Sequence, residues 1–239
     1  MKIMYVFPHP DDESFGPALG MSAQMRAGHE VYLLTTTKGG ATKQRHKLGL
    51  SIEEMGEVRY KEMLDVEKVL GLAGMTVLDM PDSGMKEMDP REIEKMVKAE
   101  IEKVQPDILV TYPVHGISGF HDHLVIHAVM KRLYLQMKDE GADYIKRLAF
   151  FTLNEEGAKK ANEKNIFNIS SSPDELIDCA MPITDEDKQK MRDALMCYKT
   201  YQETIANTGI MDMQGDKAYY EFYREDFNPP LDDITKELN

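Results

Sequence analysis

The chain has 239 residues, of which 42 are Asp or Glu and 29 are Lys or Arg, giving a formal net charge of −13. Nucleic-acid binding needs a basic stripe along the phosphate backbone, and an anionic membrane surface also selects for positive charge. The composition therefore argues against nucleic acid and membranes as partners. Hydrophobic residues make up 42% of the chain, which is enough for a folded core.

The start of the chain is apolar only over a strand-length run, without the basic and long apolar regions of a signal peptide. No apolar run reaches the 18 or so residues of a membrane-spanning helix. The two cysteines, Cys179 and Cys197, form neither a disulfide framework nor a metal-type pair. We therefore expect a cytoplasmic protein in a reducing compartment.

Short β-rich runs alternate with longer helical patterns through the first 153 residues. In chain order, the patterns predict strand 3–7, helix 14–27, strand 30–36, helix 52–70, strand 75–80, helix 90–104, strand 107–112, helix 122–138 and strand 147–153. Such alternation is typical of right-handed crossovers between parallel strands. The predicted fold class is α/β: a doubly wound, mostly parallel, Rossmann-like sheet with helices on both faces and a C-terminal elaboration.

The pattern loosens after residue 154. A helix is predicted over 185–200, and a Tyr/Phe-rich segment follows at 218–227. This segment could stack on a sugar, but apolar packing or an oligomer contact is favoured. Residues 155–239 contain 19 acidic and 10 basic residues, so most of the negative charge lies here. Because no Gly/Ser linker intervenes, we predict a catalytic core at 1–153 and an elaboration of the same domain at 154–239.

A dense group of polar residues follows the first strand. His9 and Asp12 are suited to bind one cation, and Asp11 would then be placed to take a proton from water. The alternative is that Asp12 or Ser14 simply caps the next helix. His9 is not needed for a cap, which favours the metal interpretation. The glycine fingerprint of a dinucleotide site is absent from this turn, which makes a nicotinamide enzyme a poor alternative.

A second group follows the fourth strand, where four of the seven histidines lie within thirteen residues. The group contains His115, His121, Asp122, His123 and His127. The last two histidines are spaced i, i+4 on one helix face, which can chelate zinc, but the HExxH motif is absent. So many histidines at one strand end predict a functional site, although not all of them can be ligands.

Topology is expected to join the two groups. In a common doubly wound order, strands one and four are neighbours where the winding reverses, and their carboxyl ends border one crevice. His9, Asp12 and His123 would supply three metal ligands and leave a fourth position for water, as in a catalytic zinc site. Asp122 would orient a neighbouring imidazole.

These segments resemble the PIG-L/LmbE-like family of zinc-dependent N-deacetylases. Residues 8–16, PHPDDESFG, match the family's first motif, and residues 119–123, GFHDH, resemble its second. Two further similarities are Arg59 with Glu62, and the turn at residues 81–84. The resemblance implies that His9, Asp12 and His123 hold the metal, that Asp11 is the general base and that Arg59 binds substrate.

The second motif departs from the family at its first histidine, which falls on Phe120. In relatives that histidine stabilises the oxyanion or donates a proton, so either His121 or His115 takes its place here or the role is weakened. We assign His121 and Asp122 to the catalytic set beside Asp11. Relatives often form trimers or hexamers, which makes a homo-oligomer a further possibility.

The predicted function is a zinc-dependent hydrolase that removes the acetyl group from an N-acetylated amino sugar conjugate. It would hold one Zn²⁺ or another divalent cation per chain, and its partner would be a small-molecule amino sugar. One alternative is a metal-dependent phosphoesterase, for which Lys38 and Arg59 are the available cations. Another is a metal- or sugar-binding module with little turnover, suggested by Phe120.

Overall fold

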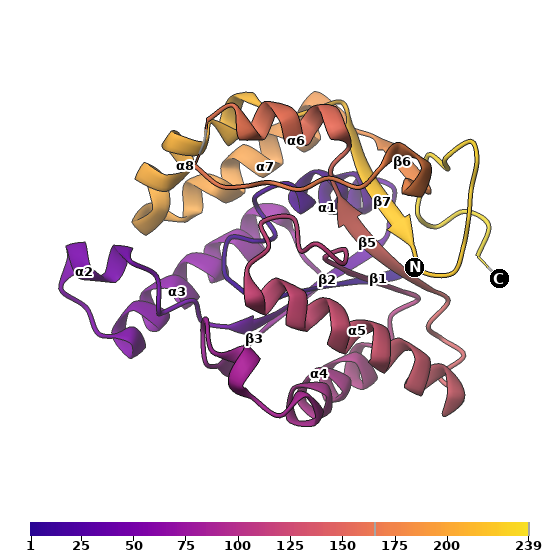
Figure 1. Cartoon of the computed structure of the whole chain (residues 1–239), viewed down its shortest axis with the longest axis horizontal. Helices are drawn as coiled ribbons and strands as arrows, with labels where there is room; N and C mark the ends of the chain where they lie inside the picture. The colour runs from indigo at the N-terminus through magenta and orange to yellow at the C-terminus, as the bar shows by residue number, and fades with distance from the viewer. Residues whose placement is uncertain (165, 239) are drawn as a thin grey trace.

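One sheet organises the computed structural model, which describes residues 1–164 and 166–238 (Figure 1). Its strand order is β3-β2-β1-β4-β5-β7-β6. The strands are β1 (Lys2–Phe7), β2 (Glu30–Thr37), β3 (Gly74–Met80), β4 (Ile108–Thr111), β5 (Arg147–Thr152), β6 (Cys179–Pro182) and β7 (Lys217–Phe222). Strands β1 to β5 run parallel to one another. Strand β7 pairs antiparallel with β5, and β6 pairs antiparallel with β7. This arrangement confirms the predicted doubly wound, mostly parallel sheet.

Helices cover both faces of the sheet (Figure 1). The α-helices are α1 (Pro17–Arg26), α2 (Gln44–Leu48), α3 (Ile52–Leu70), α4 (Pro90–Val104), α5 (His121–Asp139), α6 (Glu155–Asn162), α7 (Asp185–Cys197) and α8 (Gln202–Thr208). Short 3₁₀ helices are η1 (Met85–Glu87), η2 (Asp174–Leu176), η3 (Lys199–Tyr201) and η4 (Ile210–Asp212). Helices α1, α3 and α7 pack together on one face, and α4 packs with α5 on the other.

Strands β1 and β4 are direct neighbours in the centre of the sheet, as predicted. Ile3 pairs with Ile108 and Tyr5 with Val110, and all four side chains are fully buried. Burial on both faces explains why these strands read as continuous apolar runs. The segments that follow β1 and β4 therefore leave the sheet side by side, which brings the two predicted polar groups together.

The first helix begins later than predicted, at Pro17 instead of residue 14. Gly16 has φ +139°, which a side chain would not tolerate, and a Cβ there would lie 2.9 Å from Cζ of Phe151. Pro17 then suits the first helical turn. Since the capping position is Gly16, without a side-chain bond, neither Asp12 nor Ser14 caps the helix. The capping alternative for these residues is wrong.

The last third contains more regular structure than the sequence indicated. Strand β6 and helices α6 and α8 were not predicted, and the helix expected over 185–200 ends at Cys197. The Tyr/Phe-rich segment forms β7, in which Tyr220 is fully buried with its hydroxyl oxygen 2.9 Å from that of Tyr5. Phe222 is buried as well. Packing, the favoured interpretation of this segment, therefore accounts for it better than sugar stacking.

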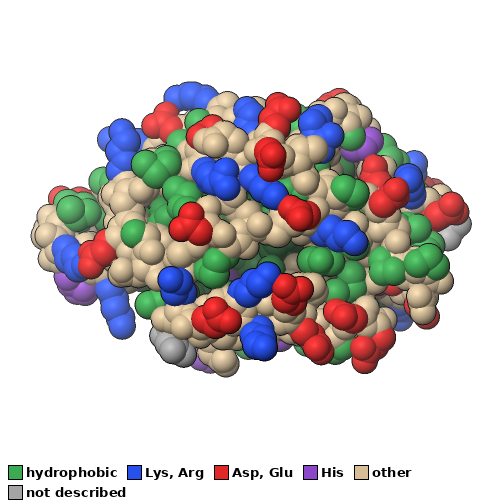
Figure 2. Space-filling view, turned by 90° about the horizontal axis from the view of Figure 1, so that it is seen from above, with side chains coloured by type: hydrophobic (Ala, Val, Ile, Leu, Met, Phe, Trp, Pro, Cys, Tyr) green, Lys and Arg blue, Asp and Glu red, His purple; other side chains and the backbone are tan. Residues whose placement is uncertain are grey.

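The surface carries both signs of charge. On the face shown in Figure 2, Lys and Arg side chains lie among Asp and Glu side chains, with apolar patches between them. Within residues 1–164 and 166–238, no helix has both the length and the apolar character to cross a bilayer.

A buried carboxylate joins the last third to α1. Thr184 and Asp187 form a capping box at the start of α7, with Thr184 Oγ1 donating to Asp187 Oδ2 at 2.7 Å. From α1, Ser22 Oγ donates to Asp187 Oδ1 at 2.8 Å and Arg26 Nη2 donates to Oδ2 at 2.9 Å. Burial opposes the ionisation of Asp187, but the hydrogen bonds from Arg26, Thr184 and Ser22 outweigh it and lower the pKa.

Replacing Asp187 with Asn should lower the free energy of unfolding by about 1–3 kcal/mol, because an amide nitrogen would face these donors. A depressed pKa in the folded state stabilises the protein above the unfolded carboxyl pKa, and this contribution disappears as pH falls through the folded value. The difference between the two proteins should therefore shrink on acidification. Urea unfolding across an acid pH series measures it. Asp185→Asn, an exposed change in the same helical turn, is the control, and an equal loss in both variants would contradict the prediction.

Candidate metal and active site

The turn after β1 folds its own side chains into position. Asp12 Oδ2 accepts a hydrogen bond from the backbone N–H of His9 at 2.8 Å, and the carbonyl of Asp11 accepts from the N–H of Ser14 at 2.8 Å. Asp11 has φ +84°, in the left-handed region that a non-glycine residue seldom adopts. Such strain is typical of functional sites. The turn thus holds His9, Asp11 and Asp12 at the carboxyl end of the central strand.

Three residues from the two predicted groups form a compact donor set. His9 Nδ1 lies 3.3 Å from His123 Nε2 and 3.5 Å from Asp12 Oδ2, and His123 Nε2 lies 3.3 Å from Asp12 Oδ1. Zinc–nitrogen bonds of about 2.0–2.1 Å in tetrahedral geometry place two ligand atoms about 3.3–3.4 Å apart. The spacing and the mixed imidazole and carboxylate chemistry therefore fit a zinc ion.

Each of the two histidine rings, His9 and His123, uses one nitrogen for a hydrogen bond away from the donor set and turns the other nitrogen toward it. His123 Nδ1 is 2.9 Å from the carbonyl oxygen of Gly116, which can only accept, so Nδ1 carries the proton. His9 Nε2 is 3.1 Å from Asp122 Oδ2, which fixes the proton there in the same way. In the neutral rings that bind a metal, the lone pairs of His9 Nδ1 and His123 Nε2 point toward each other and Asp12. Asp122 thus lies where the sequence analysis placed it, beside a candidate ligand.

The charges around this set favour a cation. Burial favours the neutral form of His9, but the carboxylates of Asp12, Asp122 and Asp82 outweigh it and raise the pKa to about 10. Burial also opposes the ionisation of Asp12, yet the His123 and His9 rings lower its pKa well below the usual range. Without a metal, a protonated His9 ring therefore offsets part of the charge of these carboxylates, and a bound cation would take over this role.

Asp82 and Ser83, in the turn after β3, were given no role from the sequence. Asp82 Oδ1 lies 3.4 Å from His9 Nε2, and Asp82, His9 and Asp122 form a second group with ligand spacing. The backbone N–H of Ser83 donates to Asp122 Oδ2 at 2.8 Å. The signal that could have found them is the polar turn at the end of β3, which lies at the same sheet edge.

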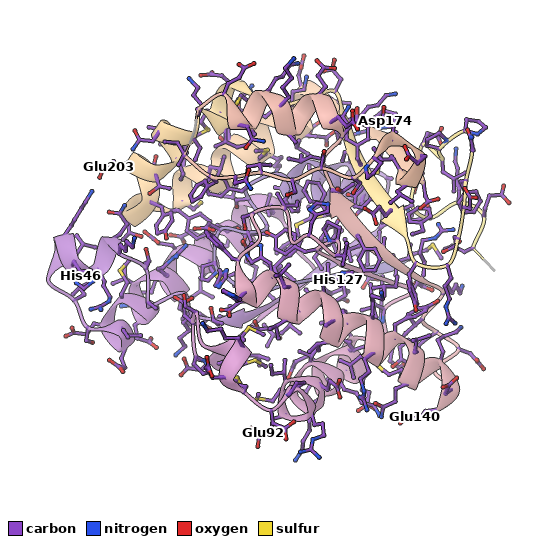
Figure 3. The ribbon with its side chains drawn as sticks, in the orientation of Figure 1. His46, Glu92, His127, Glu140, Asp174 and Glu203 are labelled. Carbon is purple, nitrogen blue, oxygen red and sulfur yellow. The ribbon has the colours of Figure 1, made fainter. Side chains whose placement is uncertain are left out.

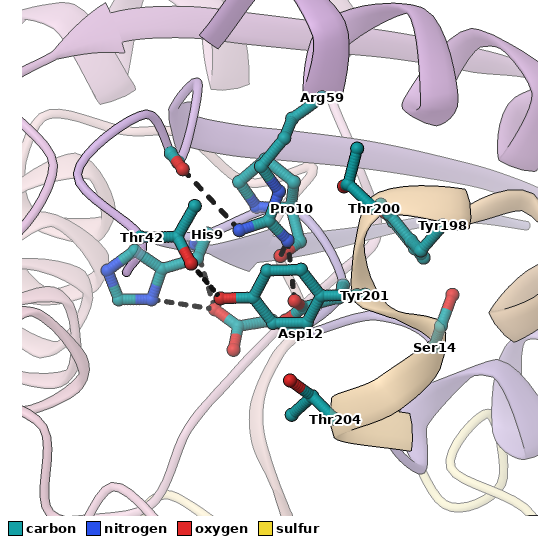
Figure 4. A network of polar contacts seen from close by, with 12 residues as sticks. His9, Pro10, Asp12, Ser14, Thr42, Arg59, Tyr198, Thr200, Tyr201 and Thr204 are labelled. Carbon is teal, nitrogen blue, oxygen red and sulfur yellow. Dashed lines mark hydrogen bonds and ion pairs between the residues drawn. The ribbon is translucent and has the colours of Figure 1, made fainter. Parts of the chain in front are cut away.

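Asp11 is paired with Arg59 of α3, and Figure 4 shows Arg59 between Pro10 and Tyr201. Arg59 Nη2 donates to Asp11 Oδ2 at 2.5 Å and to the carbonyl of Pro10 at 2.7 Å, and the guanidinium lies 4.2 Å from the ring centre of Tyr201. Burial raises the pKa of Asp11 to about 6, against the opposing effect of Arg59. Arg59 is only 2% exposed, so its contacts in this structure hold the Asp11 turn. Its predicted role in substrate binding stays a prediction.

The remaining histidines of the second group differ in whether they line the cavity. His121, the first residue of α5, is exposed and lines the cavity at the donor set. His115 Nδ1 accepts from the N–H of Ile117 at 3.1 Å, and His115 is outside the cavity lining. His127 lies further along α5 (Figure 3), where its Nδ1 is 2.9 Å from the carbonyl oxygen of Tyr112. Of the two replacements considered for Phe120, the geometry favours His121, and the i, i+4 pair does not form a chelate.

The last third contributes contacts that sequence patterns did not indicate. Tyr198 Oη donates to Glu13 Oε1 at 2.7 Å, and Thr200 donates from both its N–H and its hydroxyl to Glu62 at 2.8 Å. Glu13 is fully buried, and burial raises its pKa to about 7. These partners lie far apart in the sequence, so no local pattern joins them. The segment after α7 therefore packs directly on α3 and on the turn at residues 8–16, here called the motif turn.

All seven predicted site residues line one cavity of about 730 Å³. They are His9, Asp11, Asp12, Arg59, His121, Asp122 and His123. Tyr112 also lines it and stacks on His123, with ring centres 4.3 Å apart and an interplanar angle of 8°. The arrangement combines a candidate metal set, the partly buried carboxylate of Asp11 and room for a ligand, as a hydrolytic centre requires.

Solved structures share this fold. A triple mutant of a deacetylase from the teicoplanin biosynthetic pathway superimposes with a TM-score of 0.67 at 14% identity, covering 95% of this chain and 99% of that chain. The 4-carboxy-2-hydroxymuconate hydratase of Pseudomonas putida does so with a TM-score of 0.65 at 13% identity, covering 92% and 94%. At such identities the likeness shows the fold alone, and the two activities differ.

Sequence comparison identifies the family. A 1D-myo-inositol 2-acetamido-2-deoxy-α-D-glucopyranoside deacetylase of Kineococcus radiotolerans is 27% identical over 168 residues, covering 59% of this chain and 46% of the relative. The chain spans about half the length of the curated relatives that it matches first. Residues 4–134 match the profile of the PIG-L family, described as GlcNAc-PI de-N-acetylase. The match includes both polar groups and more than half of the chain, which therefore belongs to the PIG-L family.

Proposed function

We propose that this chain is a zinc-dependent hydrolase that removes the acetyl group from an N-acetylated amino sugar conjugate. The observation that carries the proposal is the convergence of His9 Nδ1, His123 Nε2 and the Asp12 carboxylate beside the partly buried carboxylate of Asp11. The relative from Kineococcus radiotolerans is named for the deacetylation of an acetamido sugar. Its name supports the amino-sugar substrate class proposed here.

His9, Asp12 and His123 would hold the ion, which when bound supplies Lewis-acid activation of a water molecule and the substrate carbonyl. Asp11 accepts a proton from the attacking water and returns it to the amine that leaves. Its pKa, raised to about 6 by burial, keeps it ionised at neutral pH while leaving it basic enough to take the proton. Asp122 holds the ring of His9 through Nε2.

His121 is the imidazole that we propose to stabilise the oxyanion. It stands at the start of α5, where backbone N–H groups also favour negative charge, and it lines the cavity. Phe120 cannot supply this hydrogen bond, and its ring instead lies edge-on to His123 with centres 5.5 Å apart. The departure from the family motif would thus shift the electrophilic role by one residue.

The phosphoesterase alternative depended on Lys38 and Arg59. Lys38 Nζ is 2.6 Å from Glu57 Oε1, and Arg59 is paired with Asp11. Both cations already form ion pairs with carboxylates, which weakens this alternative.

Cys179 and Cys197 are both free thiols. On this ground we also propose the cytoplasm as the protein's compartment. The cavity and the name of the Kineococcus radiotolerans relative support a small-molecule amino sugar as its partner. A homo-oligomer stays a prediction.

An acetate-release screen tests the function. The purified chain, freed of metal by chelation and reloaded with Zn²⁺, is assayed on N-acetylglucosamine conjugates and, in parallel, on aryl phosphate esters. We expect a free amine and acetate in equal amounts, only from the acetamido substrates and only after reloading. Phosphate release alone would favour the phosphoesterase. Zinc binding without release of either product would favour a binding module.

The pairing of Arg59 with Asp11 gives a prediction that separates two roles. Arg59→Lys keeps the charge but loses the planar guanidinium, whose Nη2 donates to both the Pro10 carbonyl and Asp11. If Arg59 positions Asp11, kcat should fall about 10–100-fold with little change in KM, because a displaced base reacts poorly. Steady-state kinetics measures this, with Lys61→Met on the exposed side of α3 as the control. A rise in KM at unchanged kcat would instead indicate substrate binding.

A further inference from the structure

The cavity has two different walls because of the strand order. The candidate metal set lies at the ends of β1 and β4, in the centre of the sheet. Strands β2 and β3 lie on one side of this centre and β5 on the other. Lining residues that follow β2 and β3 therefore approach the site from one side, and those at the end of β5 and in the segment up to residue 169 approach it from the opposite side. Tyr201 and Thr204, which come later in the chain, join the first side through Thr42 and Gln44. The two sides differ in chemistry.

The wall after β2 and β3 is polar. It is lined by Thr42, Gln44, Asp82 and Ser83, whose hydroxyl, amide and carboxylate groups suit the hydroxyls of a sugar. These groups are also held in place: Gln44 Nε2 donates to Thr204 Oγ1 at 3.2 Å, and Asp82 Oδ2 accepts from the N–H of Ala41 at 2.7 Å. This side of the cavity is therefore the natural place for the amino sugar.

The wall formed by the end of β5 and the segment up to residue 169, here called the β5 wall, is mainly apolar. It consists of Phe151, Leu153, Ala161, Ile166, Phe167 and Ile169, with Lys164 as its charged member. Two members, Ile166 and Phe167, remain 45% and 38% exposed. Phe167 also meets the ring of Phe120 edge-on, with centres 6.0 Å apart, and Phe120 is 49% exposed. Large side chains that stay exposed together at a cavity are a sign of a ligand that covers them.

An acetamido sugar alone leaves this wall unused. Its acetyl group ends in a single methyl, and its ring is polar. The volume of 730 Å³ lies in the range of about 300–1,000 Å³ typical of cavities for drug-sized ligands, so it has room beyond one sugar ring. The scissile amide must lie at the centre, with its two ends leading away from the donor set. One end can meet the polar wall while an attached group meets the β5 wall.

We propose that the natural substrate carries an apolar group larger than a methyl, which lies against the β5 wall while the amino sugar faces the polar wall. The inference rests on the proposed function, since it places the amide at the metal set. The apolar group is either the acyl chain of the scissile amide or an apolar aglycone of the sugar. Both sources present the same chemistry to the wall, and the experiment separates them.

Two substrate series, assayed by amine release with the zinc-loaded protein, test the proposal. One lengthens the acyl chain of glucosamine from acetyl to butyryl and hexanoyl. The other keeps the acetyl group and lengthens the β-glycoside from methyl to butyl and hexyl. We expect kcat/KM to rise about two- to fourfold per added methylene in one series, which identifies the source. No rise in either series would overturn the inference.

Matched variants locate the effect on the β5 wall. Phe167→Ser should flatten the dependence on chain length, because the exposed ring is removed without opening the core. Leu176→Ser, at an apolar residue that is 51% exposed and outside the cavity lining, should keep the slope of the wild type. A slope that persists in Phe167→Ser and in Ile166→Ser would place the apolar group elsewhere and overturn the inference.

Binding measurements keep this inference separate from the proposed function. If acetyl substrates are hydrolysed without any gain from longer chains, the function stands and the inference fails. If no amine is released at all, the function fails, and calorimetry on the longest member of each series still tests the wall. About tenfold weaker binding in Phe167→Ser than in wild type for one of these ligands would support the inference. Equal binding for both would overturn it.

Discussion

Replacing Asp11 with Asn should lower kcat by about 10²–10⁴-fold while zinc stays bound, because the amide cannot take a proton from water. Within the motif turn (residues 8–16), Asp11 is the cavity-lining carboxylate that pairs with Arg59 instead of with a histidine of the donor set. Removing its charge therefore leaves the three candidate ligands in place. Amine release by the zinc-loaded variant, together with its metal content, measures both parts of this expectation.

Asp79→Asn provides the matched control for that experiment, since Asp79 is an exposed carboxylate at the end of β3 and outside the cavity lining. It should retain the activity of the wild type. Full activity of Asp11→Asn with zinc bound would show that another group acts as the base. Loss of zinc from Asp11→Asn would show instead that this carboxylate belongs to the metal set.

Replacing His123 with Ala should weaken zinc binding by more than about 100-fold and abolish activity at stoichiometric zinc. Removing a residue that only hydrogen-bonds to a metal ligand lowers metal affinity about 10–100-fold, which is the change expected for Asp122→Asn. Removing a ligand itself should lower the affinity further. Competition against a chromogenic chelator measures the affinity. Activity restored to His123→Ala by excess zinc, at a lower kcat, would agree with a damaged but occupied site.

His127→Ala tests the alternative ligand on the same helix. His127 is one turn beyond His123, but its Nδ1 is bound to the carbonyl of Tyr112 and its ring packs 4.9 Å from that of Phe150. Zinc affinity should therefore remain that of the wild type, with circular dichroism confirming that the variant folds. Zinc loss in His127→Ala but not in His123→Ala would reverse the assignment.

Much of the fold and of the donor set could be predicted because their signals are local. Alternating strand and helix patterns indicate a parallel sheet, and a polar turn after a buried strand places its side chains at the carboxyl edge. The neighbouring positions of β1 and β4 then follow from a common winding order, which brings His9 and Asp12 to His123. The roles of these residues in binding and catalysis stay predictions that the variants above test.

The rest depends on contacts between distant segments. The pattern did not reveal that Gly16 delays the first helix, since the φ of +139° and the approach of Phe151 that exclude a side chain there are set by packing. Nor could it show that Arg59 faces Asp11, because that pairing depends on how α3 packs against the turn. Tyr198 reaches Glu13 across 185 residues of sequence separation. Such pairings are decided by packing in three dimensions.

The contacts made by the segment after α7 limit how this fold can be recombined. Residues 198–201 place a hydroxyl on Glu13, two donors on Glu62 and an aromatic face on Arg59. A chimaera that joins residues 1–153 of this chain to the last third of a relative would leave both buried carboxylates without these donors unless the graft keeps them. For engineering, the β5 wall can therefore be exchanged as a unit. Residues 198–201 must be kept together with the motif turn, because they supply the donor to its buried Glu13.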